Sequence, residues 1–150
     1  MKKIILLSIF TVSIHSYECK YINDFKLAGE KYNIDYILLC ALGQVESKYN
    51  PYALNFNTKN NYDIGIMQIN SWWFKKLKTV GMYDPRILFD YKYNIEIGSW
   101  IMKNCIIDFG ISKQAIDCYN KGAKKAKTSS TYINKVETAY KILQQGINDE

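Results

Sequence analysis

The chain has 150 residues, of which 48% are hydrophobic, 15% aromatic and 23% charged. A chain of this length suits one compact domain, and its composition excludes a disordered, collagen-like or repetitive protein. The 20 basic and 14 acidic residues give a net charge of +6, which is too small and too evenly spread to indicate nucleic-acid binding.

Residues 1–16 have the pattern of a secretory signal peptide. Lys2 and Lys3 provide a positive start, and an apolar stretch follows over residues 4–14. This stretch is shorter than the about 20 apolar residues that a membrane-spanning helix needs. We therefore predict cleavage near Ser16, an exported periplasmic or secreted protein without stable membrane insertion, and one domain over residues 17–150.

Apolar residues recur at helical spacing along most of the remaining chain, which predicts a mainly α-helical domain. A first short helix is expected over residues 25–32, ending near Asn33. A second helix is capped by Asp35 and ends near Ser47, before Pro51. The buried stripe expected on this second helix consists of Ile37, Leu38, Ala41, Leu42 and Val45.

The middle of the chain has weaker signals. Residues 50–63 are rich in asparagine and lack periodicity, which predicts a long surface loop or a small strand pair. Loops of this length in compact domains are usually functional. Ser71 is expected to cap a helix that stops at Gly81, and an aspartate followed by a proline predicts a short helix over residues 84–88.

Three further helices are expected in the last part of the chain. A long helix over residues 90–109 is closed by Gly110, and Ser112 caps a short helix that ends before Gly122. A last helix begins at Thr131. Its apolar face comprises Tyr132, Val136, Tyr140 and Leu143, before Gly146.

Four cysteines in an exported chain predict disulfides, with three possible connectivities among Cys19, Cys40, Cys105 and Cys118. No short cysteine spacing indicates a metal site, and the single histidine, His15, lies in the predicted signal peptide. We therefore predict neither a metal nor a cofactor. Serine and cysteine hydrolase triads are excluded for the same reason, because they need a histidine base.

Aromatic and basic residues indicate the kind of ligand. Aromatic rings cover the apolar faces of sugars, so the tyrosines, with Trp72 and Trp73, fit a sugar-binding cleft, although most of them are expected in the core. The mildly basic charge favours anionic partners such as cell-wall polymers. The densest basic run is interpreted as a solvated loop; it contains Lys121, Lys124, Lys125 and Lys127.

Glu46 stands near the C-terminal end of the apolar second helix. Burial disfavours the charged form of a carboxyl, and the negative end of the helix dipole acts in the same direction, so the pKa of Glu46 is expected to rise. A carboxyl of this kind suits a general acid. The alternative is a glutamate at a helix end whose carboxylate simply reaches water.

Three short motifs lie in order along the chain: Glu46-Ser47, Gly65-Ile66-Met67-Gln68, and Tyr119-Asn120 followed by Gly122. Their order and spacing resemble the three motifs of the soluble lytic transglycosylase (SLT) family, which has the lysozyme-like fold. The likeness covers about residues 19–143. Members of similar size are exported and commonly serve type III or type IV secretion, pilus or conjugation machines.

The resemblance implies a peptidoglycan lytic transglycosylase: a lysozyme-like single domain whose long loop or small strand pair lies beside the active-site cleft. In this family one catalytic carboxyl, here Glu46, protonates the glycosidic oxygen between N-acetylmuramic acid and N-acetylglucosamine. The same group then takes the proton from the muramic acid 6-hydroxyl, which attacks its own anomeric carbon and leaves a 1,6-anhydro product. The implied partners are glycan strands and components of a type III or type IV secretion or conjugation machine.

The resemblance also implies roles for residues around Glu46. Ser47 is expected to position the carboxyl, Gly65 to let the backbone approach the sugar, and Gln68 to bond its polar groups. The Tyr119 hydroxyl is expected to bond to the carboxyl, although an ordinary buried tyrosine is the alternative. The other predicted substrate-binding residues are Ile66, Met67, Asn120 and Trp72, of which the first two equally suit the core.

Two features depart from the usual family pattern. Cysteines at positions 40 and 118 are unusual there, and because the family fold packs their two helices together, the resemblance favours a Cys40–Cys118 disulfide. Asp63 matches the second carboxylate of animal c-type lysozymes, which suits a hydrolytic muramidase using Glu46 and Asp63. An aspartate that accepts backbone hydrogen bonds in a turn, and a non-catalytic glycan-binding assembly factor, remain as alternatives.

Overall fold

The computed structural model describes residues 18–84 and 88–148. The predicted signal peptide and residues 85–87 of the predicted short helix lie outside the described residues, and the flanking Asp84 and Leu88 are not helical. The elements are α1 (Ile22–Tyr32), α2 (Tyr36–Ser47), β1 (Leu54–Thr58), β2 (Asn61–Ile64), β3 (Ile69–Asn70), the 3-10 helix η1 (Ser71–Trp73), α3 (Phe74–Thr79), α4 (Tyr91–Phe109), α5 (Lys113–Lys121), the 3-10 helix η2 (Ala123–Lys125) and α6 (Thr131–Asn148).

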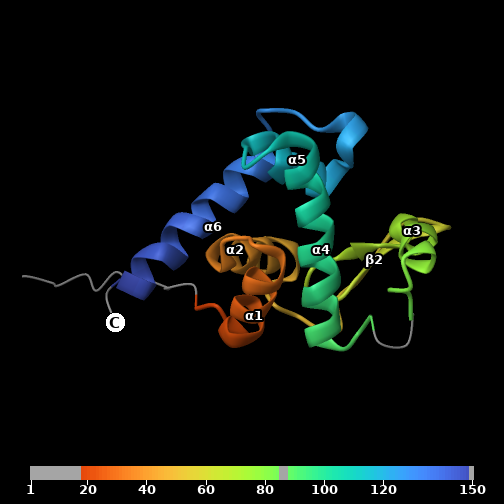
Figure 1. The fold of residues 1–150 in the computed structure, drawn as a ribbon, viewed down its shortest axis with the longest axis horizontal. Helices are drawn as coiled ribbons and strands as arrows, with labels where there is room; N and C mark the ends of the chain where they lie inside the picture. Colours follow the sequence, from red (N-terminus) through yellow and green to blue (C-terminus); the bar gives the residue numbers. More distant parts are fainter. Residues whose placement is uncertain (1–17, 85–87, 149–150) are drawn as a thin grey trace, which may run out of the picture.

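Most of the described elements are α-helices, and the prediction of a mainly helical fold is confirmed (Figure 1). α2 packs between α1 and α6, while α4 packs against α1 and α5. The small sheet and α3 lie on the other side of α4 from α6 (Figure 1). No helix in the described ranges combines the length and apolarity that crossing a membrane requires.

Most predicted helix ends are confirmed because they depend on local hydrogen bonds. The Asp35 side chain caps α2 by accepting from the Ile37 amide, and Ser112 caps α5 in the same way. The predicted Ser71 cap is wrong. Asn70 caps this segment, and the Ser71 hydroxyl accepts instead from the amide of Tyr62 in the neighbouring strand.

The buried face of α2 differs from the predicted stripe. The buried residues are consecutive, from Leu39 to Gly43, whereas Ile37, Leu38 and Val45 are only partly buried. α2 packs against α1 on one side and α6 on another, so its middle turn is covered nearly all round. This central position fixes the helix that carries Glu46.

The asparagine-rich segment forms most of a three-stranded antiparallel sheet in the order β1-β2-β3. Its register pairs Asn55 with Asp63 and Asp63 with Asn70. Strand β1 is exposed along its whole length, which explains why its sequence lacks the alternation that marks a half-buried strand. The sheet therefore brings amide side chains beside Asp63.

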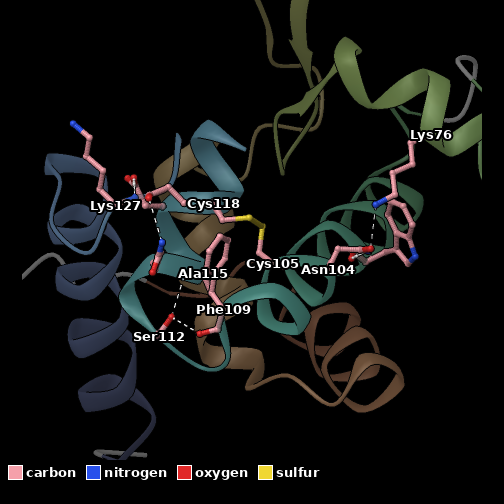
Figure 2. Close-up of a disulfide and its surroundings, with 12 residues drawn as sticks. Lys76, Asn104, Cys105, Phe109, Ser112, Ala115, Cys118 and Lys127 are labelled. Carbon is pink, nitrogen blue, oxygen red and sulfur yellow. Dashed lines mark hydrogen bonds between the residues drawn. A yellow bond between two sulfur atoms is a disulfide. The ribbon is translucent and has the colours of Figure 1, made fainter. Parts of the chain in front are cut away.

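The disulfides are Cys19–Cys40 and Cys105–Cys118, so the predicted Cys40–Cys118 pair is wrong. The first ties the segment before α1 to α2, and the second ties α4 to α5, as Figure 2 shows. The Cα atoms are 5.7 and 5.8 Å apart, within the ordinary reach of a disulfide. Cys40 on α2 thus bonds to the segment before α1, and Cys118 on α5 bonds to α4, whereas the resemblance favoured a bond between α2 and α5.

Candidate active site

An open cleft with a cavity volume of about 770 Å³ brings together residues from the sheet, α2, α4 and the α5–η2 segment. Glu46 and Asp63 both line it. The other lining residues are Asn57, Asn61, Gln68, Asn70, Trp72, Trp73, Ile101, Tyr119, Asn120, Lys121, Gly122, Ala123, Lys124 and Lys125. The cleft has the size and the mixture of aromatic and polar groups that suit an oligosaccharide.

Glu46 is half-buried near the C-terminal end of α2. Burial raises the pKa of its carboxyl to about 7, and the nearby charge of Asp63 acts in the same direction, while a hydrogen bond from Tyr132 opposes both. A pKa near 7 leaves a large share of both protonation states at neutral pH. This group therefore suits proton donation followed by proton acceptance.

Tyr132, at the start of α6, is the partner of the Glu46 carboxyl. Its hydroxyl donates a hydrogen bond of 2.5 Å to Oε1 of Glu46. The hydrogen bond that the resemblance implied between Tyr119 and Glu46 is not formed, because the Tyr119 hydroxyl donates to the Met67 carbonyl at 2.7 Å. The helical spacing predicted Tyr132 only as part of an apolar face, and nothing local in the sequence distinguishes it from the other tyrosines.

Replacing Tyr132 with phenylalanine should lower turnover about tenfold, since one hydrogen bond is worth about 1–1.5 kcal/mol. The Tyr132 hydrogen bond lowers the pKa of Glu46, so its loss should raise that pKa and move the alkaline limb of the pH–rate profile to higher pH. The control is Tyr140→Phe on the same helix, whose hydroxyl donates to Asp35. An unchanged alkaline limb in Tyr132→Phe would contradict the assigned contact.

Most of the Gly65–Gln68 segment lies in the protein core and supports the cleft from there. Ile66 and Met67 are fully buried, and the Ile66 carbonyl accepts a 2.8 Å hydrogen bond from the Ser47 hydroxyl. Gly65 has a φ of +76°, and a Cβ there would collide with the buried amide of Asn94. Asn94 in turn accepts from the Met67 amide at 2.7 Å. Ser47 thus holds this segment against α2, and Gly65 accommodates a core side chain.

Four of the predicted binding residues line the cleft itself: Gln68, Trp72, Tyr119 and Asn120. Gln68 has a left-handed φ of 47°, and its amide donates to the Gly65 carbonyl at 2.8 Å and accepts from Asn55. Trp72 is 69% exposed, which leaves an indole face free for a sugar ring. The cleft therefore has polar groups and an aromatic surface within the same site.

Asp63 is held by two amide side chains. Its Oδ2 accepts from Asn57 at 2.7 Å and its Oδ1 accepts from Asn70 at 2.6 Å. One amide donor thus binds each carboxyl oxygen and fixes the orientation of the side chain. The sheet register positions one donor, since Asn70 is the direct cross-strand partner of Asp63, whereas Asn57 lies on β1 where the register with β2 shifts.

An aromatic group supports one end of the cleft. The Trp73 ring meets the Trp72 and Trp100 rings at centroid distances of 5.0 and 6.0 Å. The Lys76 ammonium lies 5.3 and 5.2 Å from the centroids of Trp73 and Trp100. It also donates to the Asn104 side chain at 3.3 Å, toward which it points in Figure 2. The sequence predicted Trp100 as a core residue of the long helix and gave no signal that it supports the cleft together with Lys76.

Comparison with known proteins decides the family. The family model described as Transglycosylase SLT domain matches residues 23–142. The chain belongs to this family. The chain is also 33% identical over 125 residues to invasion protein IagB of Salmonella typhi, covering 81% of this chain and 78% of the relative. It is 30% identical over 115 residues to protein IpgF of Shigella sonnei, covering 75% and 76%.

The solved structures support the same fold. A structure of an inactive mutant of the lytic transglycosylase Slt from Pseudomonas aeruginosa matches with a TM-score of 0.74 over 88% of this chain, at 15% sequence identity. The chain spans only 25% of that solved chain, so the likeness concerns one domain. The predicted lysozyme-like fold is confirmed, and as a member of the SLT family the chain is a peptidoglycan lytic transglycosylase.

Proposed function

We propose that Glu46 is the catalytic acid and base of this SLT domain and that the bond cleaved joins N-acetylmuramic acid to N-acetylglucosamine. In the first step the Glu46 proton passes to the glycosidic oxygen, and the bond from that oxygen to the muramic acid anomeric carbon breaks. The observation that supports this role is the pKa of about 7 on the one half-buried carboxyl held by a tyrosine in the cleft. The leaving glycan then carries a free hydroxyl.

In the second step the ionised Glu46 accepts the proton of the muramic acid 6-hydroxyl. The oxygen of that hydroxyl attacks the positively polarised anomeric carbon, and a 1,6-anhydro ring closes. No water is consumed, and Glu46 ends protonated as it began. Tyr132 stabilises the ionised carboxyl between the two steps through its 2.5 Å hydrogen bond, and the exposed Trp72 offers a stacking surface to a neighbouring sugar.

A hydrolytic muramidase is the second candidate, and the position of Asp63 in the same cleft favours it. In that reaction Asp63 would act on the anomeric carbon or on a water molecule. We favour an electrostatic role, because amide donors already bind both Asp63 oxygens and because the charge of Asp63 raises the pKa of Glu46. Asp63 then helps to keep the acid protonated.

Mass spectrometry of the fragments released from purified peptidoglycan separates these reactions. Lytic cleavage yields 1,6-anhydro products that are lighter by one water molecule than the products of a muramidase. We expect the anhydro products. Products with a reducing end would show that the protein is a hydrolytic muramidase. If no fragments were released, a glycan-binding assembly factor would be favoured.

The Asp63→Asn variant should retain the anhydro product. Removing the negative charge should lower the pKa of Glu46, because Asp63 raises it in the native protein, and the alkaline limb of the pH–rate profile should move to lower pH. A rate loss of about tenfold is expected from weaker protonation of Glu46. If Asp63→Asn loses all product while its fold and its binding to glycan persist, Asp63 is a catalytic residue.

We further propose that the enzyme is exported to the periplasm or beyond and opens the wall locally for a type III or type IV secretion or conjugation apparatus. Two observations support export: the signal-peptide pattern of residues 1–16 and the pairing of Cys19, Cys40, Cys105 and Cys118 in disulfides, which persist in oxidising compartments. The relative named an invasion protein fits such a setting. Cleavage near Ser16 can be checked by N-terminal sequencing of the exported protein.

A further inference from the structure

The segment after α5 brings a basic wall to the cleft that the proposed mechanism does not use. Lys121, Lys124 and Lys125 line the same cleft as Glu46 and Asp63. The composition of this basic run predicted a solvated loop. The structure corrects that interpretation in part, because these lysines are exposed but belong to the site.

A buried carboxylate fixes this wall in place. Asp117 on α5 is fully buried, and it accepts hydrogen bonds from the Lys121 ammonium at 2.9 and 3.1 Å and from the Lys127 amide at 2.8 Å. It also accepts from the Ser130 hydroxyl at 2.6 Å, just before α6 begins. The segment that bears the lysines is therefore attached at both ends to one side chain, so its cationic groups are held beside the cleft.

The lysines differ in what they can bind. The ammonium of Lys121 is already paired with Asp117, so its charge is largely neutralised. In the described part of the chain, no carboxylate pairs with Lys124 or Lys125, and both side chains are exposed on η2. Two unpaired ammonium groups on a fixed wall attract an anion that enters the cleft. Lysine is a flexible point charge, which suits carboxylates whose positions vary.

We propose that Lys124 and Lys125 bind carboxylates on the lactyl-peptide branch of muramic acid, and so favour glycan strands that carry peptide stems over bare strands. This inference rests on the proposed peptidoglycan substrate. N-acetylated sugars themselves are uncharged, so the anionic groups of the polymer lie on that branch. A bare strand offers one lactyl carboxylate for each muramic acid, whereas a stem offers carboxylates farther from the sugar.

The test measures binding separately from cleavage. The catalytically silent Glu46→Gln protein is combined with Lys124→Ala and Lys125→Ala, and its affinity is measured by calorimetry for three glycan fragments of equal length. One fragment carries peptide stems, one carries stems whose carboxylates are amidated, and one is stripped to the lactyl acid. The control in the same background is the double substitution Lys135→Ala with Lys141→Ala. These two exposed lysines lie on α6 away from the cleft, so their loss removes the same amount of charge without changing the cleft.

Exposed ion pairs are weak, so we expect the cleft pair of substitutions to weaken binding of the stem-bearing fragment about three- to tenfold at low salt, and less as salt rises. Binding of the amidated fragment should not change. An equal loss for the stripped fragment would show that the lysines bind the lactyl carboxylate and would overturn the preference for peptide stems. Unchanged affinity for both charged fragments, or the same loss in the α6 control, would overturn the proposal.

Failure of the wider function has a different signature. If the wild-type protein bound all three fragments with the expected lysine dependence but released nothing from peptidoglycan, the catalytic proposal would fail and the carboxylate site would stand. If the protein cleaved all glycans with equal efficiency and without any dependence on Lys124 and Lys125, only the carboxylate site would fail.

Discussion

Replacing Glu46 with glutamine should reduce release of glycan fragments by about 10²–10⁴-fold, the usual contribution of a general acid or base. The amide keeps the shape of the side chain but has no proton to give at neutral pH. Burial raises the pKa of the native carboxyl to about 7, so ionising it above that pH costs stability in the folded protein. The variant should therefore melt at a higher temperature than the native protein at pH 8.

The direction of this stability change follows from the two protonation states of Glu46. The ordinary pKa of the carboxyl is 4.5, so between that value and about 7 the folded state holds a proton that the unfolded state has lost, and stability falls as pH rises through this window. Glutamine removes that dependence. Glu30→Gln, on an exposed position of α1, is the matched control and should leave activity and melting unchanged. Retained cleavage by Glu46→Gln would remove this residue from the mechanism.

Replacing Asp117 with asparagine should destabilise the fold by about 3 kcal/mol, because it leaves buried donors without their anion. For a domain of this size the melting temperature should fall by roughly 10 °C. Burial alone would raise the pKa of Asp117, but hydrogen bonds from Ser130, Lys121 and the Lys127 amide outweigh it and lower the pKa below its ordinary value of 3.8. Calorimetric unfolding of both proteins measures the difference.

The pH dependence provides an internal check on this prediction. A lowered pKa stabilises the folded protein fully above pH 3.8 and loses that contribution as pH falls through the folded value. The difference in the free energy of unfolding between the native protein and Asp117→Asn should therefore be constant from pH 5 to 8 and become smaller in acid. Asp108→Asn, an exposed position on α4, should cost less than about 0.5 kcal/mol. A difference that did not become smaller in acid would mean that the anion is not the stabilising group.

The sequence predicted features that depend on neighbours in the chain. Asp35 and Ser112 cap their helices as expected because a cap bonds to an amide two or three residues away. Gly110 likewise ends α4 with a positive φ. Ser71 was the wrong cap because two adjacent residues can both cap a helix, and a cross-strand bond to Tyr62 determines which one does.

Features that depend on distant parts of the chain were not predictable in the same way. The disulfide partners depend on how α1 and α4 pack around α2 and α5, and the family packing of α2 with α5 gave the wrong pair. The carboxyl partner is Tyr132 rather than Tyr119 because α6, not α5, brings its hydroxyl to Glu46. The raised pKa of Glu46 was predictable, because burial disfavours the charged form of a carboxyl on an apolar helix. Its catalytic role stays a prediction.

The bond between Tyr132 and Glu46 joins residues 86 positions apart in the chain. The acid is therefore synthesised long before the helix that completes its surroundings. Until α6 docks, water reaches the carboxyl, burial no longer raises its pKa, and the group is mostly ionised at neutral pH. If Glu46 has the proposed catalytic role, a growing or threading chain thus has no competent acid, and wall-cutting activity begins only when α6 has folded into place.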